Sequence, residues 1–149
     1  MSGIDLAAVT QAAEAFALEF ESDFERFEGT ASVEAEIEAF RHAHARVREG
    51  GWFRYVVPES FGGQAVGEAA TPDTVCVRAM GAIRQAFAFR HAMLDLAFVE
   101  QGLGSFPIAL GHLTGEGASG GVIDAELADV LKRTAAGELI PALGLTEAN

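Results

Sequence analysis

The residues of this sequence that could bind a metal or transfer a proton cluster early in the chain, without the spacing that such chemistry needs. His42 and His44 lie two positions apart, so on a helix they point to different faces, and no cysteine or carboxylate stands at metal-site spacing from them. We expect His44, on the apolar face, to be a hydrogen-bonded core histidine, with a metal ligand as the alternative. Glu34, Glu36 and Glu38 are spread round the same helix, so they do not form the carboxylate pair that acid–base catalysis uses.

Two further features have the letters of a functional motif but not its context. The segment Gly115–Gly120 matches the dinucleotide-binding pattern G-x-G-x-x-G. That pattern needs a preceding strand and a helix that opens on it, so that backbone amides face a pyrophosphate, and we therefore expect a plain flexible loop. The lone cysteine, Cys76, cannot form an internal disulfide, and its apolar neighbours Val75 and Val77 indicate a small core residue.

The elements that position these residues are helices, because apolar residues recur every three or four positions along most of the chain. This period predicts an all-α fold, an up-and-down bundle of about five to six helices. Between Gly51 and Thr71 the period disappears, and crowded aromatic residues followed by Pro58 and a glycine pair predict an ordered apolar loop. The expected helices run from Ile4 to Phe27, from Ser32 to Gly50, from Thr71 to about Gln101 with a break between Phe87 and His91, from Ser105 to Leu113, and from Asp124 to Gly137.

Each expected helix carries one apolar stripe, and together the stripes predict a core rich in phenylalanine. The sequence holds eleven Phe residues against one Trp and one Tyr. Gly102 and Gly104 are expected to stop the long third stretch, and Ser105 to cap the short helix after it. The predicted buried residues are Val9, Ala13, Phe16, Phe20, Phe24, Phe27, Val33, Ile37, Phe40, His44, Val47, Val75, Ala79, Ile83, Phe87, Leu94, Ala97, Phe98, Gln101, Leu127, Val130 and Leu131.

The charge of the chain excludes some classes of partner. The formal net charge is −12, and ten of the acidic residues against a single basic one, Arg26, precede Arg41. Such a surface repels nucleic acid phosphates and anionic lipid, so we expect neither nucleic acid nor membrane binding. The sequence shows no basic and apolar leader and no apolar run of about 18 residues, and we expect a cytoplasmic protein.

Three segments, taken in order, resemble the acyl-CoA dehydrogenase family. Residues 51–63, GWFRYVVPESFGG, are similar to the family's apolar loop that ends in Pro-Glu and Gly-Gly. Residues 103–111, LGSFPIALG, resemble its helix junction with Leu-Gly, Pro-Ile and a later glycine. Residues 136–147, AGELIPALGLTE, resemble the family's entry into its flavin-binding barrel. The expected helix lengths also agree with the family's N-terminal bundle, in which the last helix is followed by a strand.

The resemblance implies an FAD-dependent enzyme that desaturates an acyl-CoA thioester and passes electrons to an electron-transferring flavoprotein. It places Phe98, Gln101 and Leu103 against the acyl chain, where their bulk would set chain length. It assigns three residues to the flavin, Leu143, Leu145 and Thr146. It assigns no catalytic residue to this chain, because the family's catalytic glutamate comes from a C-terminal helical domain.

On this resemblance we expect a helical domain over residues 1–140 and the first strand of a flavin-binding β-domain at 141–149. The chain would then be a piece of a larger enzyme, inert and free of FAD by itself. Apolar helix faces around Phe87 to Leu110 would be uncovered, which predicts a homo-oligomer. The alternatives are a flavin-dependent monooxygenase on the same scaffold and a free-standing helical interaction module.

Overall fold

The computed structural model describes residues 5–27, 32–67, 73–114 and 125–141. Within these ranges every regular element is helical, and the predicted all-α class is confirmed. No helix there combines the length and the apolarity that crossing a membrane requires. The elements in chain order are α1 (Leu6–Phe24), η1 (Glu25–Phe27), α2 (Val33–Glu49), η2 (Trp52–Val56), η3 (Glu59–Phe61), α3 (Val77–Arg90), α4 (Ala92–Thr114) and α5 (Ala125–Ala135), where η marks a short 3₁₀ helix.

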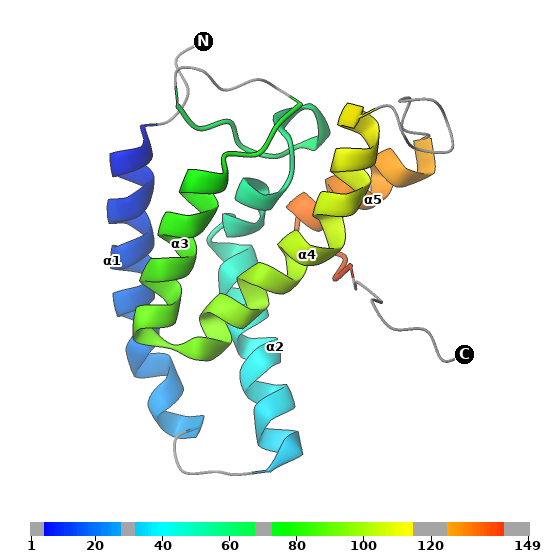
Figure 1. Ribbon diagram of the computed structural model, residues 1–149. Coiled ribbons are helices and arrows are strands. Elements are labelled where there is room, and N and C mark those ends of the chain that lie inside the picture. The colour runs from blue at the N-terminus through cyan, green and yellow to red at the C-terminus, as the bar shows by residue number, and fades with distance from the viewer. Residues whose placement is uncertain (1–4, 28–31, 68–72, 115–124, 142–149) are drawn as a thin grey trace, which may run out of the picture.

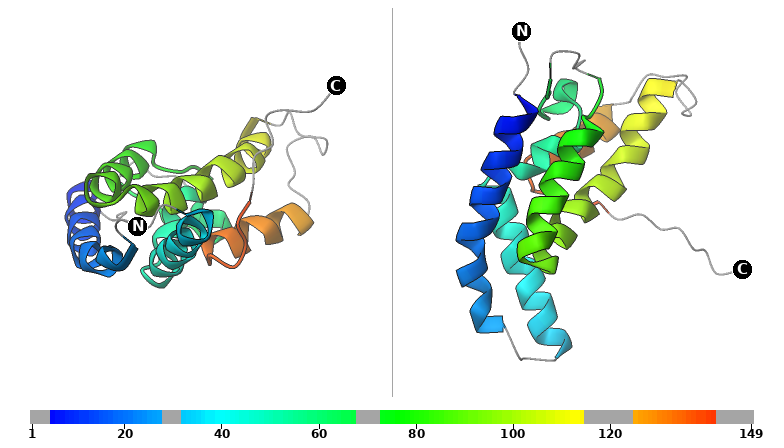
Figure 2. Two further views of the ribbon diagram at one scale, coloured as in Figure 1. Left: turned by 90° about the horizontal axis from the view of Figure 1, so that it is seen from below. Right: turned by 60° about the vertical axis from the view of Figure 1, so that its left-hand side comes forward.

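The helices form a bundle in which α4 is oblique to α1, α2 and α3. Helices α1, α2 and α3 run roughly along one axis, and α4 slants away from them toward α5 (Figure 1). Helix α1 packs mainly on α3, and α4 packs on both α2 and α3. Helices α3 and α4 meet at a corner and diverge from it in two different views (Figures 1 and 2).

Local sequence signals set several of the helix ends as predicted. The Ser32 hydroxyl accepts a hydrogen bond from the Ala35 amide at 3.1 Å and caps the start of α2. Helix α5 is followed by Gly137, whose φ of 67° lies in the left-handed region that glycine adopts at low cost. The predicted break before His91 is also confirmed, because His91 is extended and separates α3 from α4. Its Nδ1 accepts a hydrogen bond from the Met93 amide at 3.2 Å, in the first turn of α4.

The predicted end of a helix at Gly102 and Gly104 is wrong, because α4 continues through both to Thr114. Each glycine lets the helix approach a neighbour closely. A Cβ on Gly102 would lie 3.3 Å from the Met80 side chain, and one on Gly104 would lie 2.5 Å from Pro141. A glycine inside a helix costs about 1 kcal/mol relative to alanine, and at these two positions it avoids those close contacts. Ser105 is therefore not a cap but a buried helical residue.

The start of α3 also differs from the prediction. The expected start at Thr71-Pro72 lies outside the described residues, but Asp73 to Cys76 are not helical and α3 begins at Val77. Thr74 and Val75 are β-branched, so they lose side-chain freedom in a helix, which favours an extended lead-in. Cys76 in that lead-in is half-buried against the core.

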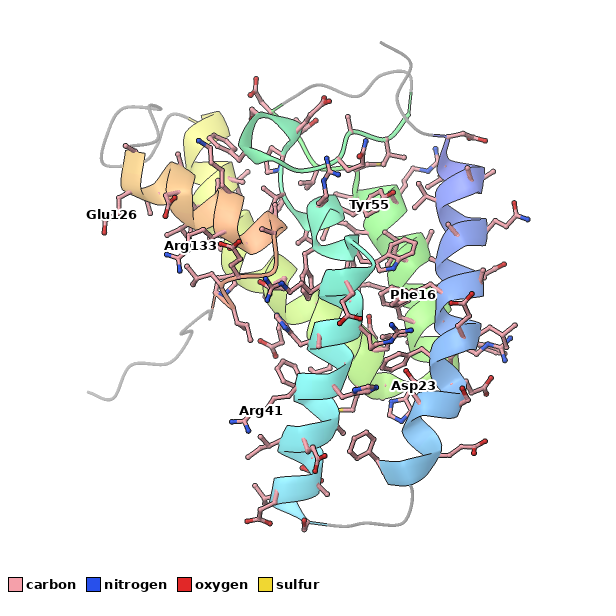
Figure 3. All side chains as sticks on the ribbon, turned by 180° about the vertical axis from the view of Figure 1, so that it is seen from behind. Phe16, Asp23, Arg41, Tyr55, Glu126 and Arg133 are labelled. Atoms are coloured by element: carbon pink, nitrogen blue, oxygen red, sulfur yellow. The ribbon has the colours of Figure 1, made fainter. Side chains whose placement is uncertain are left out.

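The core is rich in aromatic side chains, as predicted. Phe16 points from α1 into the bundle (Figure 3), where its ring centroid lies 5.4 Å from that of Trp52 and 5.5 Å from that of Phe87. Phe87 makes an edge-on contact with Phe98 at 5.7 Å, which joins α3 to α4. These rings connect α1, η2, α3 and α4.

Several predicted core positions are exposed instead. Val33 and Ile37 are 66% and 46% exposed, whereas α2 buries the predicted Val47 together with Ala39 and Ala43, which the prediction missed. The first turns of α2 extend beyond the α3–α4 corner, so no helix from that side covers them (Figure 1). Leu127 on α5 is 39% exposed, although Leu131 on the same helix is buried.

Candidate functional site

An apolar groove lies between the diverging faces of α3 and α4. Its volume is about 390 Å³. The lining residues recur at helical spacing on each helix, so one face of α3 opposes one face of α4. They are Val77, Met80 and Arg84 from α3, and Phe98, Val99, Gly102, Leu103, Phe106 and Pro107 from α4.

The floor of the groove is core and its walls are open to solvent. Phe98 is fully buried, and its ring packs on Phe87 beneath the groove. Leu103 is 48% exposed and Phe106 is 38% exposed, so both side chains present apolar surface to whatever enters. Gly102 also lines the groove, where an added Cβ would lie 3.3 Å from the Met80 side chain.

The one charged residue in the lining is held in an ion pair. Nε and Nη2 of Arg84 donate to the two carboxylate oxygens of Asp95 at 2.9 and 3.0 Å, a two-point contact from α3 to α4. This hydrogen bond raises the pKa of Arg84, so the guanidinium stays protonated. The Asp95 side chain is only 17% exposed, whereas that of Arg84 is 47% exposed. The positive charge of Arg84 is therefore neutralised by Asp95 at the place where Arg84 lines the groove.

Of the three residues predicted to face an acyl chain, the structure brings Phe98 and Leu103 together in the groove and places Gln101 elsewhere. Gln101 is fully buried on the side of α4 that packs on α2. Its Nε2 lies 2.8 Å from Nε2 of His44. Its Oε1 is buried and has no hydrogen-bond partner among the described residues.

His44 has the structural role that its position predicted. Its ring lies 4.8 Å from that of Phe53 and 6.3 Å from that of Phe40, centroid to centroid. Burial, and next the positive charge of Arg48, lower the pKa of His44, so the neutral ring is favoured. No group of three or more His, Cys, Asp or Glu among the described residues could hold a metal ion. His42 lies on another face, near Asp23 between α1 and α2 (Figure 3).

Two further hollows lie among the described residues, and neither contains a residue that the resemblance assigns to the acyl chain or the flavin. One, of about 430 Å³, lies between α1 and α3 beside Glu14, Phe89 and Arg90. The guanidinium of Arg90 is already paired with Glu21 at 3.1 Å. The other, of about 310 Å³, lies beside Tyr55 in the loop after α2. The α3–α4 groove is the hollow with the most apolar lining among the three.

Sequence reasoning missed the α3 side of the groove and the Arg84–Asp95 pair. Met80 and Arg84 alternate with the buried residues of α3, and nothing in their spacing reveals that α4 diverges there. Phe106 lies three positions after Leu103, a spacing that places both residues on one helix face. The predicted helix end at Gly102 and Gly104 concealed this relation. The predicted flavin-facing residues Leu143, Leu145 and Thr146, and the Gly115–Gly120 segment, lie outside the described residues.

Comparison with protein-family models, with curated proteins and with solved structures finds no match to this chain.

Proposed function

We propose that this chain is the N-terminal helical domain of an FAD-dependent acyl-CoA dehydrogenase and that the α3–α4 groove holds the acyl chain of its thioester substrate. The observation that carries the proposal is that Phe98 and Leu103, which the family resemblance assigns to the acyl chain, line the same apolar groove. The volume of about 390 Å³ lies within the range of about 300–1,000 Å³ that is usual for small-molecule sites.

In this proposal the domain binds and orients the substrate and excludes water. Each methylene that the groove removes from water contributes about 0.8 kcal/mol, so length and bulk decide affinity. The groove does not fit FAD itself, because the polar pyrophosphate and ribityl groups would find one charged residue there, Arg84, already paired with Asp95. The flavin, which accepts the hydride when bound, and the base that removes the α-proton would be supplied by other domains of the enzyme.

The substitution Leu103→Phe tests the proposal. Because Leu103 is half exposed on the groove wall, a larger ring has room outward but shortens the space for a chain. We expect affinity for dodecanoyl and octanoyl thioesters of N-acetylcysteamine to fall relative to the butanoyl thioester, since one lost methylene position is worth about 1–3 kcal/mol. The melting temperature should hardly change. Leu18→Phe, at an exposed leucine of α1, is the matched control and should leave the chain-length profile unchanged.

The contrary outcome is equally specific. A Leu103 that served as packing would be over-packed by Phe, at a cost of about 1–3 kcal/mol of stability. A large fall in melting temperature with an unchanged chain-length profile would therefore remove Leu103 from the site and with it the support for the proposal.

A second candidate, self-association through α4, is favoured by one observation. Leu96, Leu103, Phe106 and Leu110 are all exposed by 38% or more, and successive members are seven, three and four positions apart. Such spacing is typical of the seam along which two helices pair. In this role the domain would be a helical interaction module that binds a second copy of itself.

A further inference from the structure

We infer that the Arg84–Asp95 ion pair makes the groove selective for acyl groups whose far end is uncharged, and excludes acyl groups that end in a carboxylate. The inference rests on the proposed function, because it names the class of acyl thioester that the groove would take. It concerns residues that neither the sequence pattern nor the family resemblance singled out.

The position of the pair supports this role. Helices α3 and α4 meet at the corner at His91 and diverge from it (Figures 1 and 2). Arg84 is the α3 lining residue nearest that corner in the sequence, and Asp95 stands in the first turn of α4. The pair therefore lies at the corner end of the groove, where the tip of a chain entering from the opposite end would come to rest.

The charges of the pair determine what that tip can be. The Asp95 carboxylate accepts hydrogen bonds from Nε and Nη2 of Arg84. These are the two donors that a carboxylate on a ligand would otherwise use. An incoming carboxylate would meet the fixed negative charge of Asp95 and no free cation in the groove lining. A methyl group at the tip requires no polar partner and is accepted. An unpaired arginine at the same place would have the opposite preference.

The experiment compares two thioesters of equal acyl length. S-octanoyl-N-acetylcysteamine ends in a methyl group, and the suberic acid monothioester of N-acetylcysteamine ends in a carboxylate. Affinities are measured on the whole chain by following amide resonances of Gly102 and Leu103 in NMR titrations. For the natural sequence we expect the octanoyl compound to bind at least about tenfold more tightly.

Removing the charge of Asp95 should reverse the discrimination. Asp95→Asn frees Arg84 to bind a carboxylate, and we expect the affinity ratio to shift by about tenfold toward the suberic compound. The double variant Arg84→Gln with Asp95→Asn should lose that gain, because the cation is gone. Asp129→Asn is the matched control, since Asp129 pairs with Arg133 on the surface of α5, away from the groove.

The outcomes separate this inference from the proposed function. If the octanoyl thioester binds in the groove but Asp95→Asn leaves the ratio unchanged, the inference is overturned and the proposed function stands. If neither thioester shifts the groove resonances, both are overturned. Arg84→Gln alone covers the case in which Asp95→Asn does not fold. It leaves an unpaired Asp95 and should increase the discrimination against the suberic compound, whereas a pair that merely holds α3 to α4 would change both affinities equally.

Discussion

At the scale of single residues, the contact between His44 and Gln101 shows what a sequence pattern can determine. The spacing placed both side chains on inner helix faces, and both are there. The spacing could not show that the face of α4 with Gln101 packs on α2 and does not face a ligand. What covers a helix face depends on segments that are distant in the sequence. Leu103, two positions further on, lies on the groove side of the same helix.

This contact predicts a dependence of stability on pH. The pKa of His44 is lowered in the folded protein by burial and then by Arg48, so the unfolded chain binds a proton more readily. Its contribution to stability is complete above the unfolded value of about 6.5 and is lost as the pH falls from there toward the folded pKa. Urea unfolding at a series of pH values should show this loss.

The substitution His44→Gln isolates the effect. Glutamine keeps a polar group near Gln101 but does not titrate, so the part of the stability loss due to His44 should disappear. The same decline below pH of about 6.5 in both proteins would show that His44 does not carry it.

At the scale of elements, the course of α4 determines the shape of the molecule, and the sequence predicted where α4 begins but not how far it continues. The shift in phase of the apolar stripe correctly predicted the corner before α4, because that signal is local. The prediction of a helix end at Gly102 and Gly104 was wrong, because these glycines make room for Met80 and Pro141, which come from other parts of the chain. Pro107 also lies inside the helix, and its missing amide leaves the Leu103 carbonyl without that helical hydrogen bond.

Alanine substitutions at two helical glycines should have opposite effects on stability. A Cβ on Gly104 would lie 2.5 Å from the carbonyl oxygen of Pro141, so Gly104→Ala should cost about 1–3 kcal/mol of unfolding free energy. Gly81 in α3 has no atom within 4 Å of the added Cβ, so Gly81→Ala should stabilise by about 0.5–1 kcal/mol. Thermal and urea unfolding measure both. A neutral Gly104→Ala would mean that α4 does not pack closely on Pro141.

At the scale of the whole molecule, the bundle leaves one side of α4 uncovered at the groove, and this predicts self-association. Four apolar residues are exposed along that side, Leu96, Leu103, Phe106 and Leu110, of which Leu103 and Phe106 also line the groove. Ten acidic residues and one basic residue precede Arg41, so nine of the twelve net negative charges lie in that part of the chain, which includes α1 and the start of α2 and not this face. We expect light scattering to show a dimer or larger assembly at high concentration.

Paired substitutions locate the contact. Leu96→Glu with Leu110→Glu should give a monomer and should not weaken acyl binding, because neither substituted residue lines the groove and the seam residues Leu103 and Phe106 become accessible in the monomer. Leu18→Glu, at an exposed leucine on α1, should leave the assembly unchanged. A natural sequence that stays monomeric at high concentration would contradict the prediction.

The overall class of the molecule followed from periodicity alone, since an apolar stripe every three or four residues permits little except packed helices. Periodicity did not predict the groove, because the groove depends on the angle at which α4 leaves α3. At that angle Phe87 contacts both Phe98 on α4 and Phe16 on α1, and Phe16 is far from Phe87 in the sequence.

The most direct test of the central claim is to locate the thioester on the protein. Isotope-filtered nuclear Overhauser spectra, recorded with S-octanoyl-N-acetylcysteamine and the labelled chain, report which side chains touch the acyl protons. The account predicts contacts from the acyl chain to Met80, Leu103 and Phe106, and none to Phe89 in the hollow between α1 and α3. Contacts to Phe89 in place of the groove residues, or to none of these side chains at saturating thioester, would contradict it.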